Sequence, residues 1–244
     1  MAAKSGGKSG SSGLAVVAAL GGAALGAASA YASRYMLTDS DRHTVILGED
    51  AFANESEPVL DGGGAAIDID APAELVWQHI KQMGQDRAGW YSFEKLERLC
   101  TFDIHNHYTI HPEWQDLKPG DFLFYHQPPL GVGSIVTAID NEKHQLATIS
   151  DSRLSPTVIG SLYLNPPIGF DYFAWSWNFA VHDYRNGTSR YITKAQVTCK
   201  PFGPLQRAFI VTLLGFPSYF MLSRQCDVLK QVCEGRMPID AEHA

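Results

Sequence analysis

The sequence predicts an α+β domain, and three observations support this prediction. Alternating apolar residues in Ile67-Asp68-Ile69-Asp70 predict a short strand that runs directly into a helix. A series of strand-like segments follows between residues 122 and 198, and a long run of helical spacing occupies residues 204 to 235. Strands followed by a separate long helix are typical of the α+β class.

The opening segment covers residues 67 to 99. Asp70 lies just before Pro72, a pattern that predicts a side-chain cap ahead of a proline in the first helical turn. We expect Gly84 to end this helix, because glycine is common just after a helix end. A second helical turn is expected further on, with an apolar face formed by Phe93, Leu96 and Leu99.

Five more strands are expected from the period-two alternation of apolar residues. Asn186-Gly187 predicts a hairpin turn between the last two of them, and the prolines and glycines between residues 154 and 170 predict a loop. The expected strands are 122–126, 133–140, 146–151, 172–181 and 189–198.

The strand at residues 172–181 has the clearest alternation in the chain. Large rings occupy every second position, and small residues such as Ser176 and Asn178 occupy the positions between them. A row of large rings on one face needs an apolar partner, which we expect to be the C-terminal helix or a ligand. The rings are those of Phe173, Trp175, Trp177 and Phe179.

The last helical run carries two apolar stripes. Pro217 lies inside it and predicts a break or kink after Leu214 or Gly215, since proline disrupts a helix interior. The first stripe comprises Phe209, Leu213, Phe216 and Phe220, and the second comprises Leu222, Cys226, Leu229 and Cys233.

Two segments of the chain resemble a known superfamily. The run APAELVWQHIKQMGQDRAGWYSFEKLE at residues 71–97 and PEWQDLKPGD at 112–121 resemble the SRPBCC superfamily, also called START-like or helix-grip. Within it they are similar to bacterial polyketide-cyclase-like members of unassigned function. The resemblance covers about residues 65 to 234. It implies a curved antiparallel sheet wrapped around a long C-terminal helix with an apolar cavity between them, but no particular reaction.

The composition divides the chain into five regions. We expect a disordered basic leader at 1–12, an apolar segment at 13–32, a linker at 33–64 with one short strand at 44–47, the ligand-binding domain at 65–235 and a disordered tail at 236–244.

The apolar segment at 13–32 has two interpretations. It has no charge over twenty residues, which is long enough to span a bilayer as an uncleaved anchor. Its small-residue sites, Ala28-Ser29-Ala30 among them, also fit a cleaved signal peptide. We favour the anchor. Because Lys4 and Lys8 precede the segment, either interpretation places the domain outside the cytoplasm, membrane-anchored or secreted.

Charge and cysteine content exclude other classes of partner. The formal net charge is −7 and no basic stripe is visible, so we do not expect nucleic-acid binding. The four cysteines form no C-x-x-C motif, and we read them as buried small side chains. His105, His107 and His111 have a spacing that is compatible with three zinc ligands, but solvated loop histidines are the preferred interpretation. We expect no metal and no cofactor.

The favoured function is binding of a hydrophobic or aromatic small molecule, such as a lipid, a sterol or a polyketide-like compound. Aromatic residues make up 11% of the chain, which suits a lined cavity. The ligand-binding candidates are Trp90, Trp114, Tyr125, Phe173, Trp175, Trp177, Phe179, Phe216 and Phe220.

One alternative is a cofactor-free cyclase or isomerase in the same cavity. Asp86 would act as a base, Arg87 as an oxyanion partner and Tyr91 as a hydrogen-bond donor. Alternatively, Asp86, Arg87 and Trp114 would form a paired, buried framework that joins the two motifs. A further alternative is an interaction module with a collapsed cavity. The sequence does not predict the oligomeric state.

Overall fold

The computed structural model describes residues 26, 29–99, 102–127, 131–154, 169–184 and 186–237, except for the side chains of Leu213, Leu214 and Phe216. The chain divides into two compact units, Met1–Arg34 and Tyr35–Ala244, and the second unit contains the sheet and the long helix. The predicted leader, most of the apolar segment, most of the loop between residues 154 and 170, and the tail from residue 238 lie outside the described residues.

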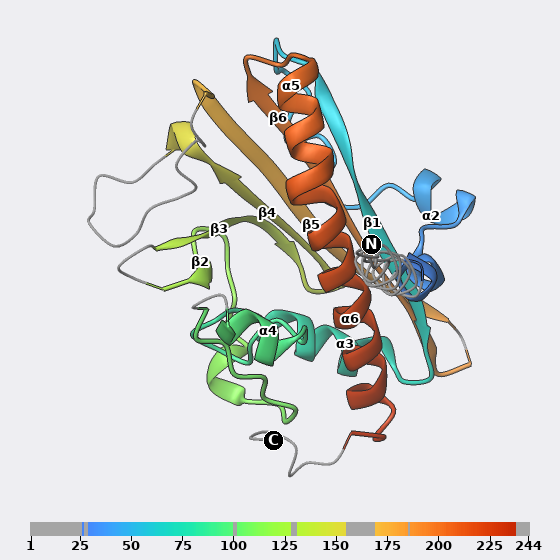
Figure 1. Cartoon of the computed structure of the whole chain (residues 1–244). Coiled ribbons are helices and arrows are strands. Elements are labelled where there is room, and N and C mark those ends of the chain that lie inside the picture. The colour runs from blue at the N-terminus through green and yellow to red at the C-terminus, as the bar shows by residue number, and fades with distance from the viewer. Residues whose placement is uncertain are drawn as a thin grey trace, which may run out of the picture. The chain divides into compact units, whose positions relative to one another are not determined.

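The core of the second unit is a six-stranded sheet in the order β1-β6-β5-β4-β3-β2, in which neighbouring strands are antiparallel (Figure 1). The predicted hairpin turn is confirmed, since Gly187 has a positive φ and its N–H donates to the carbonyl of Tyr184, the last residue of β5, at 3.1 Å. The predicted strands after residue 120 are all confirmed, most of them to within one or two residues at each end. The strands are β1 Val59–Ile69, β2 Phe122–His126, β3 Val132–Asp140, β4 Gln145–Asp151, β5 Tyr172–Tyr184 and β6 Thr188–Lys200.

The sheet is accompanied by short helices and one long one. The short α-helices are α2 Asp39–His43, α3 Ala73–Lys81 and α4 Glu94–Leu99. Single 3₁₀ turns occur at Ser33–Tyr35, Pro112–Trp114 and Ser152–Leu154.

The long helix lies across one face of the sheet (Figure 1). It consists of α5 Pro204–Phe209, a π-helical stretch Ile210–Gly215 and α6 Phe216–Cys233, without a gap. The predicted break before Pro217 is therefore replaced by a π-helical segment at that place, a known way of accommodating a disturbed helical ladder. Among the described residues this is the one helix long and apolar enough to cross a membrane by length and composition.

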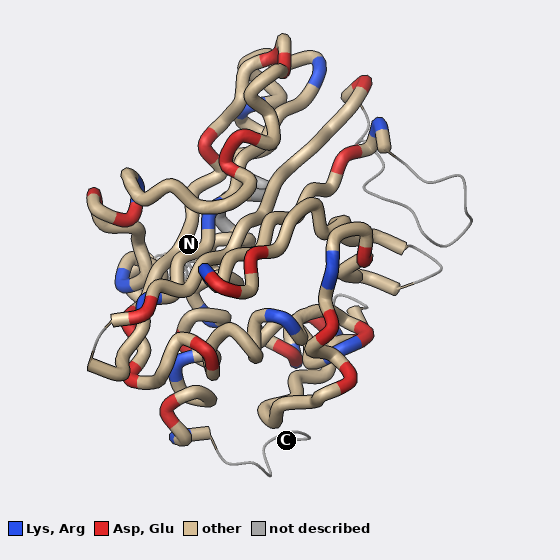
Figure 2. The backbone as a smooth tube through the Cα atoms, turned by 180° about the vertical axis from the view of Figure 1, so that it is seen from behind, with Lys and Arg blue, Asp and Glu red and all other residues tan. Residues whose placement is uncertain are grey.

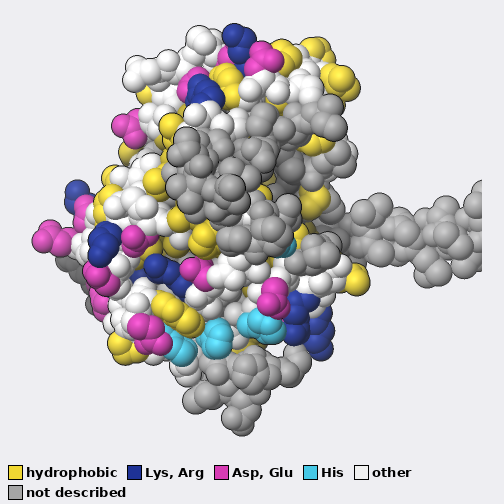
Figure 3. All heavy atoms as spheres, turned by 90° about the vertical axis from the view of Figure 1, so that its left-hand side faces the viewer, with side chains coloured by type: hydrophobic (Ala, Val, Ile, Leu, Met, Phe, Trp, Pro, Cys, Tyr) yellow, Lys and Arg dark blue, Asp and Glu magenta, His cyan; other side chains and the backbone are white. Residues whose placement is uncertain are grey.

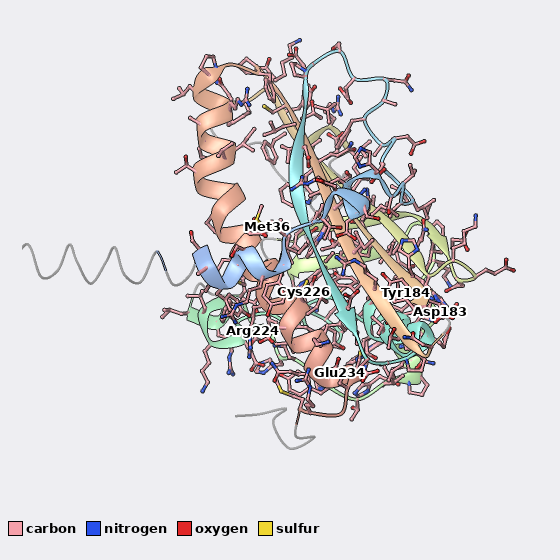
Figure 4. All side chains as sticks on the ribbon, turned by 90° about the vertical axis from the view of Figure 1, so that its right-hand side faces the viewer. Met36, Asp183, Tyr184, Arg224, Cys226 and Glu234 are labelled. Atoms are coloured by element: carbon pink, nitrogen blue, oxygen red, sulfur yellow. The ribbon has the colours of Figure 1, made fainter. Side chains whose placement is uncertain are left out.

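The C-terminal half of the long helix is hydrogen-bonded to the sheet and to the chain around α3. The Tyr191 hydroxyl donates to Gln225 Oε1 at 2.8 Å, and the Gln225 amide donates to the Trp90 carbonyl at 3.0 Å. In Figure 4, Cys226 lies within α6 and Glu234 lies at the end of the helix. Glu234 Oε1 accepts a hydrogen bond from the Asp70 backbone N–H at 2.8 Å. The strand-and-helix arrangement confirms the predicted α+β helix-grip fold.

The segment between α2 and β1 covers the outer face of the sheet, which is the face away from the long helix. Gly48 lies so close to β4 and β5 that an added Cβ would be 2.6 Å from Ala147 Cβ. Lys194 donates to the Thr44 carbonyl and to Glu49 Oε1, both at 2.5 Å. Figure 2 shows acidic and basic residues interspersed over this side.

This arrangement changes two expectations for residues 33–64. Residues 59–64, which we assigned to the linker, are part of β1 and pair with β6. The expected strand at 44–47 does not form, because its residues lie across the outer face of the sheet instead of pairing along an edge.

Three local expectations for the opening segment were also wrong. Asp70 does not cap α3, because Pro72 is the cap residue and has no side-chain hydrogen bond. The helix ends at Lys81, before Gly84. In α4 the expected apolar face is not buried: Leu96 and Leu99 are 44% and 81% exposed, whereas Glu97 is 8% exposed. The acidic side of α4 is covered by the chain that follows the helix, because the Asn106 backbone N–H donates to Glu94 Oε2.

A buried ion pair attaches α2 to the sheet. The guanidinium of Arg190 contacts both carboxylate oxygens of Asp41, at 2.7 and 2.6 Å. Asp41 is 2% exposed and also completes a capping box with Thr38. The Arg190 guanidinium holds the pKa of Asp41 well below its usual range. Removing one partner of such a pair leaves the other charge poorly compensated.

We expect Asp41→Asn to lower the free energy of unfolding by about 2–3 kcal/mol at neutral pH, because the buried pair is lost while the capping oxygen is kept. The matched control is Asp68→Asn, since Asp68 also contacts Arg190 but its side chain is 68% exposed. The control should lose less than about 1 kcal/mol. Urea unfolding of both variants measures the difference, and equal losses would contradict the assignment.

Candidate functional site

Six aromatic side chains form a continuous set of ring contacts on the helix-facing side of the sheet. Trp90 stacks on Trp177 with centroids 5.1 Å apart and lies equally close to Tyr125. Tyr125 contacts Trp175 at 5.7 Å. We call this set the aromatic wall, and its members are Trp90, Tyr125, Phe173, Trp175, Trp177 and Phe179.

Three separate parts of the fold supply these rings. β5 contributes four rings through its alternation, and β2 contributes Tyr125. Trp90 lies in the turn after α3, where its indole N–H donates to the Phe124 carbonyl at 3.1 Å. The Gln225 amide of α6 donates to the Trp90 carbonyl, so the same turn is tied to both the sheet and the long helix.

Accessibility differs along the wall. Phe173 and Phe179, at the two ends of the β5 row, are both 0% exposed. Between them Trp175 and Trp177 are only partly buried, and so is Tyr125. The middle of the wall is therefore reachable although it faces the interior side of the sheet.

The ends of the wall are closed by packing against neighbouring elements. Phe173 forms an apolar cluster with Cys199 of β6 and Ile210 of the long helix. At the other end the buried ring of Phe179 packs against Trp177 with centroids 4.8 Å apart. The wall thus has fixed ends and a more open centre.

The open centre has a small polar region. The Trp175 indole N–H donates to Tyr125 Oη at 3.3 Å, and Tyr125 Oη lies 2.6 Å from Ser134 Oγ. Burial raises the pKa of Tyr125 to about 12, against the opposing effect of these two hydrogen bonds. The phenol is therefore neutral at physiological pH and able to donate a hydrogen bond.

Two predicted ligand-binding residues, Trp114 and Phe220, make ring contacts with residues outside the wall. Trp114 packs against the rings of His111 and His107, at 4.3 and 5.6 Å. Phe220 stacks on Phe93 at 4.7 Å. The side chain of Phe216 is outside the described residues.

The three catalytic candidates are not all in one environment. Asp86 is exposed, and partial desolvation raises its pKa. The Arg87 guanidinium donates to the carbonyls of Lys81 at 3.2 Å and Trp114 at 3.5 Å, which joins the two sequence motifs as the framework interpretation expects.

Tyr91 is fully buried within a network of polar side chains. Its hydroxyl accepts from the Gln82 amide at 2.9 Å and lies 3.0 Å from His79 Nδ1. Its backbone N–H donates to Asn106 Oδ1 at 2.8 Å, and its φ of 55° lies in the left-handed region. Burial lowers the pKa of His79 to about 4, so a neutral Nδ1 can accept the Tyr91 proton.

The polar partners of Tyr91 were missed by sequence reasoning. His79 and Gln82 lie within the run at 71–97 but are not among the predicted site residues, and Asn106 lies outside both quoted runs. His79 and Gln82 lie three apart on the α3 side, a spacing that places both on one face. That spacing was the one signal in the sequence that could have identified the polar partners of Tyr91.

Histidine side chains gather on one face of the molecule, as Figure 3 shows. His105 lies 3.0 Å from Asp103, whereas His107 and His111 pack together with centroids 5.5 Å apart. The described residues contain no group of three His, Cys, Asp or Glu side chains that could hold a metal ion. Cys199, Cys226 and Cys233 are free and buried, as expected, and Cys100 lies outside the described residues.

Comparison with known proteins gives similarity at the level of the fold. No protein-family model matches the chain. No curated protein matches it. Solved structures with a similar fold include a hypothetical protein from Helicobacter pylori, with 13% identity, a TM-score of 0.44, and coverage of 81% of this chain and 99% of that one.

Two enzymes are among the similar structures. Norcoclaurine synthase from Thalictrum flavum has 15% identity and a TM-score of 0.37, with 81% of this chain and 95% of that chain covered. An aromatase/cyclase from Streptomyces sp. R1128 has 10% identity and a TM-score of 0.34, with 72% and 96% covered. The fold of this chain rests on its own strand order and long helix, as described above.

The His79 network predicts a pH dependence of stability. An unfolded histidine binds its proton near pH 6.5, but folded His79 does so only near pH 4, so acid favours the unfolded state between these values. Over that interval His79 should remove about 3 kcal/mol from the free energy of unfolding. His79→Asn should flatten this part of the curve in urea unfolding measured from pH 7 to pH 4. An unchanged slope would show that burial of His79 is not the cause.

Proposed function

We propose that this domain binds a hydrophobic or aromatic small molecule against the aromatic wall. The observation that carries this proposal is the partial exposure of Tyr125, Trp175 and Trp177 on the helix-facing side of the sheet. Large rings that face inward and still remain accessible are the lining expected of a ligand site.

The driving force for binding is burial of apolar surface. Each Å² of apolar surface removed from water contributes roughly 25 cal/mol, and flat rings add stacking contacts with an aromatic ligand. The wall loses little entropy on binding, because Trp90 is held by hydrogen bonds at its indole N–H and at its carbonyl.

The chemistry of the wall supports binding more than catalysis. A cofactor-free cyclase or isomerase needs a group that exchanges a proton near neutral pH. Tyr125 is the titratable member of the wall, and its pKa near 12 makes it a hydrogen-bond donor rather than a base. A turnover assay with the bound compound distinguishes the two functions.

We expect the full chain in lipid nanodiscs to bind naphthalene saturably in equilibrium dialysis, with empty nanodiscs as the blank. Trp175→Ala should weaken binding about tenfold, because one face of the ligand loses its ring contact. Trp114→Ala is the matched control, since Trp114 packs against His111 and His107. Thermal unfolding of both variants checks that they fold. Equal affinity for naphthalene in the two folded variants would contradict the proposal.

We further propose that residues 13–32 tether this domain to a membrane, or export it, and so place it outside the cytoplasm. The proposal rests on the sequence: an uncharged stretch of twenty residues preceded by Lys4 and Lys8. A domain that faces a membrane would receive apolar ligands directly from the bilayer.

Membrane fractionation tests the tether. The full chain should remain in the membrane pellet after alkaline carbonate washing, and a variant lacking residues 13–32 should be released. Deletion of residues 2–12 serves as the control and should leave the chain in the pellet. A shorter, soluble product from the full chain would instead identify a cleaved signal peptide. Identical fractionation with and without residues 13–32 would exclude both.

A further inference from the structure

Ser150 is a buried hydroxyl group without a partner. It is 0% exposed, and its Oγ has no hydrogen-bond partner among the residues that the structure describes. Buried polar groups in folded proteins are nearly always paired, because an unpaired one loses its hydration without compensation. An unpaired hydroxyl in the core therefore needs an explanation.

The strand register places Ser150 on the aromatic wall. Ser150 of β4 is directly opposite Trp175 of β5, so both side chains are on the helix-facing side. On its other side, Ile135 of β3 is opposite Ile149 of β4. Ser134 and Ser150 are the next residues beyond this pair, so an extension of the antiparallel ladder by one step leads to both of them on the helix-facing side.

Ser134 continues the polar region already described at the centre of the wall. Its Oγ lies 2.6 Å from Tyr125 Oη, which accepts a hydrogen bond from the Trp175 indole at 3.3 Å. A tyrosine oxygen that accepts from the indole has its own proton left to donate to Ser134. When Tyr125 donates in this pair, the Ser134 hydroxyl keeps its own proton for a further acceptor. Three neutral hydroxyl groups thus converge within a surface of rings.

We propose that Tyr125, Ser134 and Ser150 form a polar subsite that binds one uncharged oxygen function, a hydroxyl or a carbonyl, on an otherwise apolar aromatic ligand. This inference rests on the proposed function and specifies its ligand class. The oxygen of the ligand supplies the hydrogen-bond partner that Ser150 Oγ lacks. Neutral hydroxyl groups do not compensate a buried charge, so the subsite favours a phenol or ketone over a carboxylate.

A matched pair of probes tests the subsite. The full chain in nanodiscs is dialysed against 2-naphthol and against naphthalene, which share a ring system and differ by one hydroxyl group. Relative to empty nanodiscs, the chain should bind 2-naphthol about tenfold more tightly than naphthalene. Ser150→Ala should remove this preference and leave the affinity for naphthalene unchanged.

Ser176→Ala is the control variant. Ser176 is also 0% exposed with an unpartnered Oγ, but it lies on the outer face of β5. Both variants delete an unpaired hydroxyl, so both should fold at least as stably as the parent chain in thermal unfolding, while Ser176→Ala keeps the preference for 2-naphthol.

The outcomes separate the two proposals. If both probes bind with equal affinity, the subsite is wrong and the proposed function stands. If neither probe binds saturably, the proposed function fails and the subsite fails with it. If Ser176→Ala removes the preference as completely as Ser150→Ala does, the effect does not come from the wall and the subsite is overturned.

Discussion

The alternation of large and small side chains along β5 is the constraint on which the rest of the structure depends. The four rings from Phe173 to Phe179 point toward the long helix, so the helix and the turn carrying Trp90 must pack around them. Its small residues all point outward, where residues such as Gly48 can come close to the sheet. A shift of one residue in register would exchange the two faces and destroy both sets of contacts.

Charged groups attach the segment that precedes β1 to the outer face of the sheet. Asp41 with Arg190 and Glu49 with Lys194 attach the chain before β1 to β6, which lies beside β5. Such pairs stabilise little unless they are well buried and well oriented, and the Asp41 pair meets both conditions. The sheet is thereby covered on both faces, although only one cover is a regular helix.

The sequence predicted what is encoded locally and missed what depends on distant partners. The strands were placed well because alternation is a property of neighbouring residues, and the row from Phe173 to Phe179 followed directly. Nothing local shows that Arg190 pairs with Asp41, nor that Trp90 stacks on Trp177. Glu97 shows the same limit: burial beside Glu94 raises its pKa to about 7, contrary to the exposed position that its charge suggests.

The π-helical stretch has a consequence for the phase of the long helix. Ile210 and Cys226 are both buried, and Cys226 follows Ile210 by sixteen positions. At about 100° per residue, an uninterrupted α-helix would place their side chains about 160° apart, on opposite sides. A π turn takes up one extra residue, which reduces the angle to about 60°. Two apolar stripes that are out of phase in the sequence are thus rotated into one surface, and a single helix can contact the sheet along its whole length.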